Sequence, residues 1–231
     1  MTSETMLIKT LFPDAVEVVI ATPEMWERPV KVAEEQSITS AVEKRKREYR
    51  AGRHSAAAVL SMLGIEDYSL LNDPQRAPIW PPGIIGSLTH CDNFCCAVAA
   101  SQLNIASVGI DAEPLIPLPK ESTPLICHEQ ELVSLQASGH TDNFWSKVIF
   151  SAKEAFYKAY FPLCRQYLDF LEAHVELHAS QSKTKATRSG DFSIQLLTPP
   201  HYALYNQQSF SGRYLITATH IITAITLFKP S

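Results

Sequence analysis

Acidic side chains at two places along the chain have the types and spacing of ligands for a divalent cation. Residues 109–113 (GIDAE) place Asp111 and Glu113 two positions apart in an apolar run. Because successive side chains of a β-strand point to opposite faces, a strand here would present both carboxylates on one face. Residues 151–155 (SAKEA) would add a third carboxylate, Glu154, from a helix with lysines beside it. Three carboxylates with nearby bases suit a hard divalent metal that also holds a phosphate.

The helix predicted over residues 142–160 separates apolar from polar side chains. Thr141 is a candidate N-cap, and Pro162 follows the expected end of the helix. The expected buried stripe consists of Trp145, Ile149, Ala152, Phe156 and Ala159. The opposite, polar face consists of Lys147, Ser151, Glu154 and Lys158. Taken alone, such a face is typical of solvated surface, whereas beside two further carboxylates it offers an acid for the metal and lysines for phosphate oxygens.

Two other segments carry groups that can bind phosphate. A helix predicted over residues 40–63, with Ser40 as its cap, carries three arginines on its polar side: Arg45, Arg50 and Arg53. Thr89 and His90 end a predicted strand with a hydroxyl and an imidazole. In isolation, an exposed basic face and a structural histidine are the commoner roles for such residues. An arginine nevertheless suits a phosphate monoester, because its planar fork binds two oxygens at once.

Length and composition describe an ordinary globular protein. The chain has 231 residues, of which 45% are hydrophobic and 19% charged, enough for one large domain or two small ones. A net charge of −4 argues against bulk nucleic-acid binding. The polar start of the chain has no basic head before an apolar core, and the longest apolar stretch, residues 214–228, is too short and too polar to span a bilayer. We therefore expect a cytoplasmic protein with no membrane partner.

The cysteine pattern does not indicate a disulfide framework. An odd number of five cysteines without an export signal favours free thiols in a reducing compartment. Cys91, Cys95 and Cys96 could suggest a metal site, but Cys95 and Cys96 are adjacent in an apolar run and would face opposite sides of a strand. Buried small hydrophobic residues are the favoured interpretation.

The order of predicted elements indicates an α+β fold. Strands are expected at the start of the chain, over residues 5–21, and then over 84–89, 94–100 and 106–113, with further strands at 168–177, 191–197 and within 213–228. Each half has one long helix accompanied by mostly consecutive strands, which indicates α+β rather than βαβ winding. Gly52, inside the first long helix, either admits a close approach or has no special role, at a cost of about 1 kcal/mol relative to alanine.

Four sequence blocks resemble those of the 4'-phosphopantetheinyl transferases of the surfactin-type and enterobactin-synthetase-type group. They occur in the same order: RKREYRAGR at 45–53, RAPIWP at 76–81 leading into GSLTH at 86–90, GIDAE at 109–113, and FSAKEAFYK at 150–158. The second block is similar to that of the enterobactin-type branch in particular. Phe150 stands where surfactin-type relatives have tryptophan, and Thr89 where many relatives have serine.

The resemblance implies a pseudo-dimeric fold of two similarly built α+β halves, each a long helix packed on a mainly antiparallel sheet. The halves would be residues 1–104 and 105–231, with the active site between them. It implies a monomeric, Mg²⁺-dependent enzyme of siderophore or polyketide biosynthesis that transfers the 4'-phosphopantetheine arm of coenzyme A to a serine of an acyl or peptidyl carrier protein. Adenosine 3',5'-bisphosphate would leave. The N-terminal half would recognise the coenzyme A nucleotide, and the C-terminal half would carry the metal-binding acids.

The resemblance also assigns roles to individual residues. Mg²⁺ would be held by Asp111, Glu113 and Glu154, and Glu154 would accept the serine proton directly or through a water. Lys158 and Lys153 would neutralise pyrophosphate charge, Lys158 foremost. The coenzyme A nucleotide would be read by Arg45, Arg53, Arg76, Thr89 and His90.

Two other functions are compatible with parts of the sequence. A different Mg²⁺-dependent phosphate-ester hydrolase would explain the acids but not the RAPIWP and GSLTH blocks, and a catalytically silent carrier-binding module would need neither acids nor lysines. The apolar segment 115–119 (LIPLP) directly follows the metal-binding acids. Its Leu115 and Ile116 are expected either to contact a carrier domain or to pack on the second half of the protein.

Overall fold

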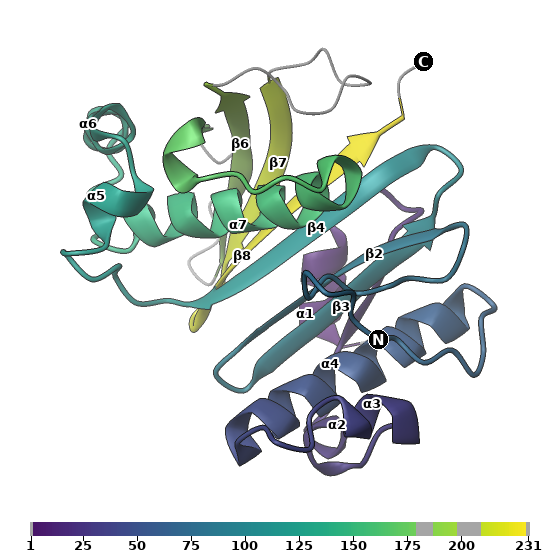
Figure 1. The fold of residues 1–231 in the computed structure, drawn as a ribbon. Helices are drawn as coiled ribbons and strands as arrows, with labels where there is room; N and C mark the ends of the chain where they lie inside the picture. Colours follow the sequence, from purple (N-terminus) through teal and green to yellow (C-terminus); the bar gives the residue numbers. More distant parts are fainter. Residues whose placement is uncertain (1, 179–186, 198–208, 230–231) are drawn as a thin grey trace.

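The computed structural model describes residues 2–178, 187–197 and 209–229, and two antiparallel sheets form its framework (Figure 1). The three-stranded sheet has the order β1-β3-β2 and the five-stranded sheet the order β4-β8-β7-β6-β5. The strands are β1 Glu17–Ile20, β2 Ile84–Cys91, β3 Phe94–Ser101, β4 Ile105–Pro114, β5 Ala173–Leu177, β6 Arg188–Leu196, β7 Ser209–Ile216 and β8 His220–Phe228. The prediction of an α+β fold with mainly antiparallel sheets is confirmed.

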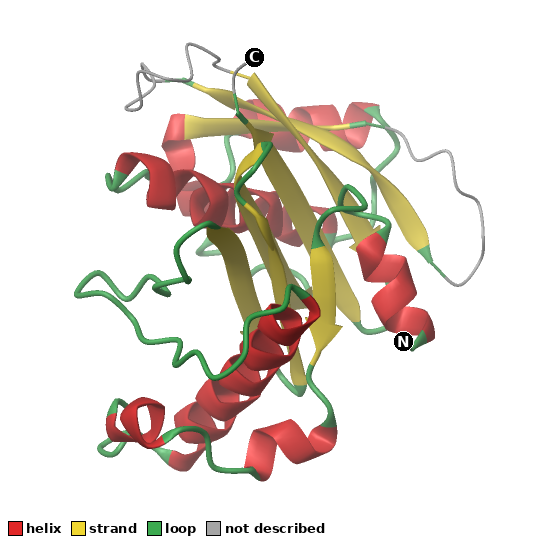
Figure 2. Cartoon of the chain, turned by 90° about the vertical axis from the view of Figure 1, so that its right-hand side faces the viewer, coloured by secondary structure: helices red, strands yellow, loops and turns green. Residues whose placement is uncertain are grey.

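Each sheet is covered by one long helix. Helix α4 (Glu43–Met62) packs on β3 and β1, and α7 (Trp145–Cys164) packs on β4 and β8. Figures 1 and 2 show these two helices on different sheets, with the shorter helices at the periphery. The shorter elements are α1 Ser3–Lys9, α2 Pro23–Glu27, α3 Val32–Gln36, α5 Thr123–Ile126, α6 Glu129–Ala137 and the 3-10 helix Phe170–Glu172. Within the described residues, no helix combines the length and the apolar character that a bilayer crossing requires.

The two sheets meet where β2 runs beside β4. The Ser87 hydroxyl accepts a hydrogen bond from the Ile110 N–H at 3.2 Å, and the Thr89 hydroxyl accepts one from the Ala112 N–H at 2.9 Å. Side chains of β2 thus satisfy backbone donors on the edge of β4 that a neighbouring strand would otherwise take. The predicted division between residues 104 and 105 falls between β3 and β4 and, like the pseudo-dimeric symmetry, stays a prediction.

Strand β4 alternates as its sequence predicts. One face, with Val108, Ile110 and Ala112, packs into the core between the two sheets. The other face, with Asp111 and Glu113, points toward α7, whose side chains contact both acids. The predicted apolar stripe of α7 is buried in a second core between that helix and the five-stranded sheet. The periods of strand and helix therefore bring the three predicted metal-binding acids to one helix–strand interface.

Gly109 allows α7 to lie directly against β4. A Cβ on Gly109 would overlap the carbonyl oxygen of Ala155 and lie 3.0 Å from the backbone N of Ala159. At Gly52 the nearest atom to such a Cβ is the Cys95 Sγ at 3.9 Å, which is ordinary van der Waals contact. The close backbone approach is at Gly109 and not at Gly52.

Several element boundaries differ from the predictions. Residues 5–21 do not form strands throughout, because Ser3–Lys9 is a helix capped by the Thr2 hydroxyl and only Glu17–Ile20 is a strand. The long helices are preceded by Val42 and Phe144 rather than by Ser40 and Thr141.

Three further differences concern the second half. Pro162 lies inside the last turn of α7, where its missing N–H removes a single helical bond, and the helix ends at the left-handed Arg165. The strand predicted from residue 168 begins at Ala173, after a 3-10 turn. The short helices α5 and α6 were not predicted. Most of the polar tract at 180–190 lies outside the described residues.

Candidate active site

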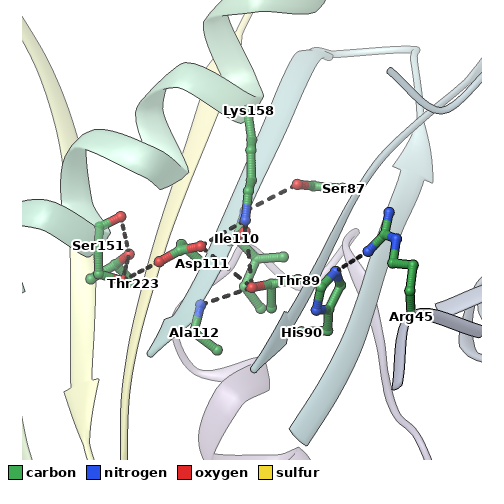
Figure 3. Close-up of polar contacts among 10 residues, drawn as sticks. All are labelled: Arg45, Ser87, Thr89, His90, Ile110, Asp111, Ala112, Ser151, Lys158 and Thr223. Atoms are coloured by element: carbon green, nitrogen blue, oxygen red, sulfur yellow. Dashed lines mark hydrogen bonds and ion pairs between the residues drawn. The ribbon is translucent and has the colours of Figure 1, made fainter. Parts of the chain in front are cut away.

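Asp111 lies at the centre of the site, bound by side chains from both halves of the chain (Figure 3). Its Oδ1 accepts a hydrogen bond from the Lys158 Nζ at 2.6 Å and a longer one from the Thr89 hydroxyl at 3.4 Å. Its Oδ2 accepts one from the Ser151 hydroxyl at 2.8 Å. Asp111 is 4% exposed, so its charge is stabilised by these donors rather than by bulk water.

The other two predicted metal-binding acids flank Asp111. The Glu113 carboxylate pairs with the Lys147 Nζ at 3.1 Å. Burial, followed by the charge of Asp111, raises the pKa of Glu113. The same two causes raise the pKa of Glu154, which lies one turn before Lys158 on α7. Both pKa increases are expected for carboxylates that lie close together in a partly desolvated site. A bound cation would offset the repulsion between these carboxylates.

The donor chemistry of these acids fits a divalent cation. Carboxylate oxygens are the preferred ligands of Mg²⁺, and the mutual repulsion of the three acids favours a positive ion between them. Among the residues that the structure describes, no three His, Cys, Asp or Glu side chains already converge as a metal centre. Lys147 and Lys158 instead supply positive charge to Glu113 and Asp111. The residues therefore fit the ion by type and charge, with two lysines as their present counter-ions.

A cavity of about 700 Å³ opens beside the acids. Six of the seven residues predicted to bind the coenzyme A nucleotide or pyrophosphate line it: Arg45, Arg53, Arg76, Thr89, His90 and Lys158. Because Lys158 and Thr89 also contact Asp111, they connect the cavity with the acidic cluster. The cavity is thus a mainly basic site, and Lys158 and Thr89 on its wall bond Asp111 behind it.

Arg53 is a buried cation at the cavity. It is 5% exposed, its Nη2 donates to the Asn72 Oδ1 at 2.6 Å, and its guanidinium lies 4.1 Å from the centre of the Tyr49 ring. Its Nε has no hydrogen-bond partner among the residues that the structure describes. Since a buried charge is costly unless it is paired, Arg53 favours an anionic ligand in this cavity.

His90 is held in its neutral form. The Arg45 Nη1 lies 3.0 Å from the His90 Nε2, and because a guanidinium can only donate, Nε2 must accept. The Nδ1 faces Glu48 Oε2 at 3.7 Å. Burial, and less strongly the charges of Arg45 and Lys158, lower the pKa of His90 despite Glu48. Arg45 and His90 therefore form a pair that a phosphate could separate and bind.

Lys153 is not brought to the site. Its Nζ donates to the carbonyl oxygens of Ile126 and Phe170 and to Glu131 Oε2 at 3.0 Å, so all three of its protons are used. Five residues separate it from Lys158, which places the two side chains about 140° apart around the helix. The prediction that Lys153 contacts pyrophosphate disagrees with this placement. Lys153 instead forms a buried ion pair that joins α7 to α6.

The loop before β2 adds Asn72 and Asp73, which the sequence did not indicate, to the predicted Arg76 and Trp80. Asn72 holds Arg53, and the Asp73 carboxylate accepts hydrogen bonds from the Gln75 and Ala77 N–H groups. Asp73 also forms an ion pair with Arg165 at the end of α7, which ties this loop to the second half. Arg76 has a left-handed backbone (φ 68°) at this turn. The Trp80 side chain covers Gly86, where a Cβ would lie 2.5 Å from the ring.

Comparison with known proteins gives the same family over most of the chain. Residues 33–100 match the 4'-phosphopantetheinyl transferase N-terminal domain, and residues 107–219 match the 4'-phosphopantetheinyl transferase superfamily. The chain is 36% identical to the 4'-phosphopantetheinyl transferase Npt of Nocardia iowensis, over 95% of this chain and 99% of that one. It is 34% identical to PptT of Mycobacterium tuberculosis, over 96% and 98%.

Relatives named enterobactin synthase component D match a shorter part. The protein of Escherichia coli K12 is 32% identical over 50% of this chain and 55% of its own length. These matches support the similarity to the enterobactin-type branch, and they support neither the hydrolase nor the silent-module alternative. The buried arginine, the acid cluster and the basic cavity beside it thus occur in a chain that belongs to the 4'-phosphopantetheinyl transferase superfamily.

Proposed function

We propose that this protein transfers the 4'-phosphopantetheine group of coenzyme A to a serine of an apo acyl or peptidyl carrier protein, as a Mg²⁺-dependent monomer in the cytoplasm. The observation that carries the proposal is the continuity of the site. A single cavity is lined by the predicted nucleotide-binding residues and ends at Lys158, which bonds Asp111. An anionic ligand with phosphates at two places fits this distribution of charge.

In this proposal Asp111, Glu113 and Glu154 hold the cation. When bound, Mg²⁺ would neutralise charge on the pyrophosphate and orient its oxygens. Arg45, Arg53 and His90 would bind the 3'-phosphate, and Arg76 would lie beside the nucleotide. Lys158 would neutralise the charge that the leaving bisphosphate acquires.

The chemical step joins the serine oxygen of the carrier to the β-phosphorus of coenzyme A. The bond from that phosphorus to the bridging oxygen breaks, and adenosine 3',5'-bisphosphate leaves with the bonding electrons. The serine proton would go to Glu154, directly or through a water. Burial and the charge of Asp111 raise the pKa of Glu154 in the metal-free protein.

Mass spectrometry of intact apo-carrier proteins tests the reaction. Carriers from peptide synthetase, polyketide and fatty-acid systems would each be incubated with the protein, coenzyme A and Mg²⁺. We expect a gain of one phosphopantetheine on at least one carrier, lost on replacement of its acceptor serine by alanine or on chelation of the metal. Cleavage of coenzyme A at the same rate without any carrier would contradict the proposal and indicate a hydrolase.

Glu154→Gln is the sharpest variant for the catalytic assignment. Asp111→Ala would remove the buried carboxylate that both Lys158 and Ser151 bond, and so confuse folding with function. In the described residues the Glu154 carboxylate makes no hydrogen bond or ion pair, so removing its charge relieves repulsion from Asp111. We expect transfer to fall by at least about two orders of magnitude with unchanged thermal stability.

A further inference from the structure

A chain of buried hydroxyl groups reaches Asp111 from the side opposite to the cavity (Figure 3). Ser151 on α7 donates to the Asp111 Oδ2 at 2.8 Å, and Thr223 on β8 lies behind it, with its Oγ1 2.9 Å from the Ser151 Oγ. The Thr223 hydroxyl also donates to the Ser151 carbonyl oxygen at 2.8 Å. Both residues are fully buried.

The Ser151 proton of this chain is directed toward the carboxylate. The Ser151 proton goes to Asp111, so the Thr223 proton is shared between the carbonyl and the hydroxyl oxygen of Ser151. Thr223 also lies directly opposite Asp111 in the pairing of β4 with β8. Two neighbouring strands and the helix across them therefore fix the position of Oδ2.

The Thr223 hydroxyl is a polar group among buried apolar side chains. Its neighbours Ile221, Ile222, Ala224 and Ile225 are all buried and apolar. A hydroxyl in such a strand is costly unless it is hydrogen-bonded, and valine would have nearly the same shape. The hydroxyl is therefore explained by its bonds to Ser151 and not by packing.

The partners of Asp111 divide into two kinds. Lys158 and Thr89 line the cavity and are within reach of a bound ligand. Lys158 in particular would exchange its bond to Asp111 for one to pyrophosphate. Ser151 and Thr223 lie outside that exchange, so they can hold the carboxylate in place while its other partners change.

We infer that Thr223, acting through Ser151, is a positioning residue that orients Asp111 toward the divalent cation. This inference rests on the proposed function, because it presumes that Asp111 is a metal ligand. Outer partners of this kind fix the direction of a ligand's lone pairs, and their loss typically lowers metal affinity by about tenfold or more. A purely structural threonine would leave metal affinity unchanged.

The test is isothermal titration of Mg²⁺ into the full chain saturated with coenzyme A, for the wild type and for Thr223→Val. We expect the Mg²⁺ Kd to rise about tenfold in Thr223→Val, with the half-saturating Mg²⁺ for transfer rising in parallel. The Kd for coenzyme A without metal should not change. Thr223→Ser keeps the hydroxyl and should restore Mg²⁺ affinity to within about twofold of the wild type.

Thr226→Val is the matched control, because Thr226 is on the same strand but on the opposite face and pairs with Val108. It should leave Mg²⁺ affinity unchanged. Ser151→Ala is a second route to the same result if Thr223→Val folds poorly, since it removes the hydroxyl next to Asp111. We expect the same direction of change as for Thr223→Val.

The outcomes separate the inference from the proposed function. If the wild type binds Mg²⁺ and both Thr223→Val and Ser151→Ala bind it equally well, the positioning role is overturned while the metal assignment stands. A wild type that binds coenzyme A but shows neither Mg²⁺ binding nor Mg²⁺-dependent transfer overturns the metal assignment and this inference with it. A weakened Kd that Thr223→Ser fails to restore shows a packing effect and also overturns the inference.

Discussion

Gly109 on β4 lies directly beneath the carbonyl group of Ala155 on α7. A Cβ at this position would overlap the carbonyl oxygen, which belongs to helix backbone and cannot turn away as a side chain could. The glycine therefore sets how closely the helix with Glu154 and Lys158 approaches the strand with Asp111.

Gly109→Ala should destabilise the protein by about 3 kcal/mol or more, because the helix must move off the strand. Denaturant unfolding measures the change in free energy. Gly52→Ala is the matched control, since a Cβ there meets only ordinary contact, and alanine favours a helix by about 1 kcal/mol. Equal stability of Gly109→Ala and the wild type would contradict the close packing.

Lys153→Met should lower stability by about 3–5 kcal/mol, because it leaves Glu131 buried without its counter-ion. Burial lowers the pKa of Lys153 even though the charge of Glu131 opposes the shift. The charged form of Lys153 therefore depends on its buried partner Glu131. Coenzyme A affinity, measured on the folded fraction, should stay unchanged. Lys158→Met is the comparison, which should lose transfer. A stable Lys153→Met variant with weakened coenzyme A binding would restore the pyrophosphate role.

Arg53→Gln should weaken binding of coenzyme A much more than binding of dephospho-coenzyme A. The loss of a charged hydrogen-bond partner for the 3'-phosphate is worth roughly 1.5–3 kcal/mol. Calorimetric titration of both ligands gives the two differences. Arg50→Gln is the control, because Arg50 is on the same helix but pairs with Glu35. An equal loss for both ligands would mean that Arg53 acts through Asn72 and the loop that it holds.

The affinity for coenzyme A should depend on pH through His90. Its pKa is lowered in the free protein, and a bound 3'-phosphate would raise it by stabilising the imidazolium. Binding then takes up a proton, so the affinity advantage of the wild type over His90→Gln should grow as the pH falls from about 8 to about 6. The comparison with His90→Gln cancels titration of the phosphate itself. Dephospho-coenzyme A should show no such growth, and an advantage independent of pH would exclude the role.

Ile116→Ser should weaken the carrier interaction without loss of stability. Ile116 is 56% exposed, whereas Leu115 is half-buried against the core of the second half and Leu118 is buried. Leu115 thus packs on the second half as one of the two predictions expected, whereas a carrier contact stays a prediction for Ile116. We expect Ile116→Ser to raise the carrier KM with unchanged melting temperature and coenzyme A affinity.

Leu118→Ser is the matched control for that prediction. It should lower stability by about 1.5–3 kcal/mol, because a buried apolar side chain is lost. A fall in melting temperature in Ile116→Ser with an unchanged carrier KM would contradict the partner surface.

Local periodicity was sufficient for much of the site. Alternation along residues 109–113 placed Asp111 and Glu113 on one face, and the helical period placed Ser151, Glu154 and Lys158 on the other side of the same interface. Lys153 shows the limit of transferring a role by resemblance, because its position on the helix wheel already set it apart from Lys158. The predicted N-cap residues of the two long helices were wrong. Ser40 and Thr141 are residue types that favour an N-cap, but they lie a few residues before the helices begin.

The sequence by itself determined the chemistry of this protein: the acids, the basic residues and the two periods that orient them. The tertiary structure decided which residues meet across long separations. Thr89 bonds the edge of β4, Asp73 pairs with Arg165, and Thr223 reaches Asp111 through Ser151. Such contacts depend on how sheets and helices pack, and a hydrogen bond between residues far apart in the chain leaves no periodic signal in either segment.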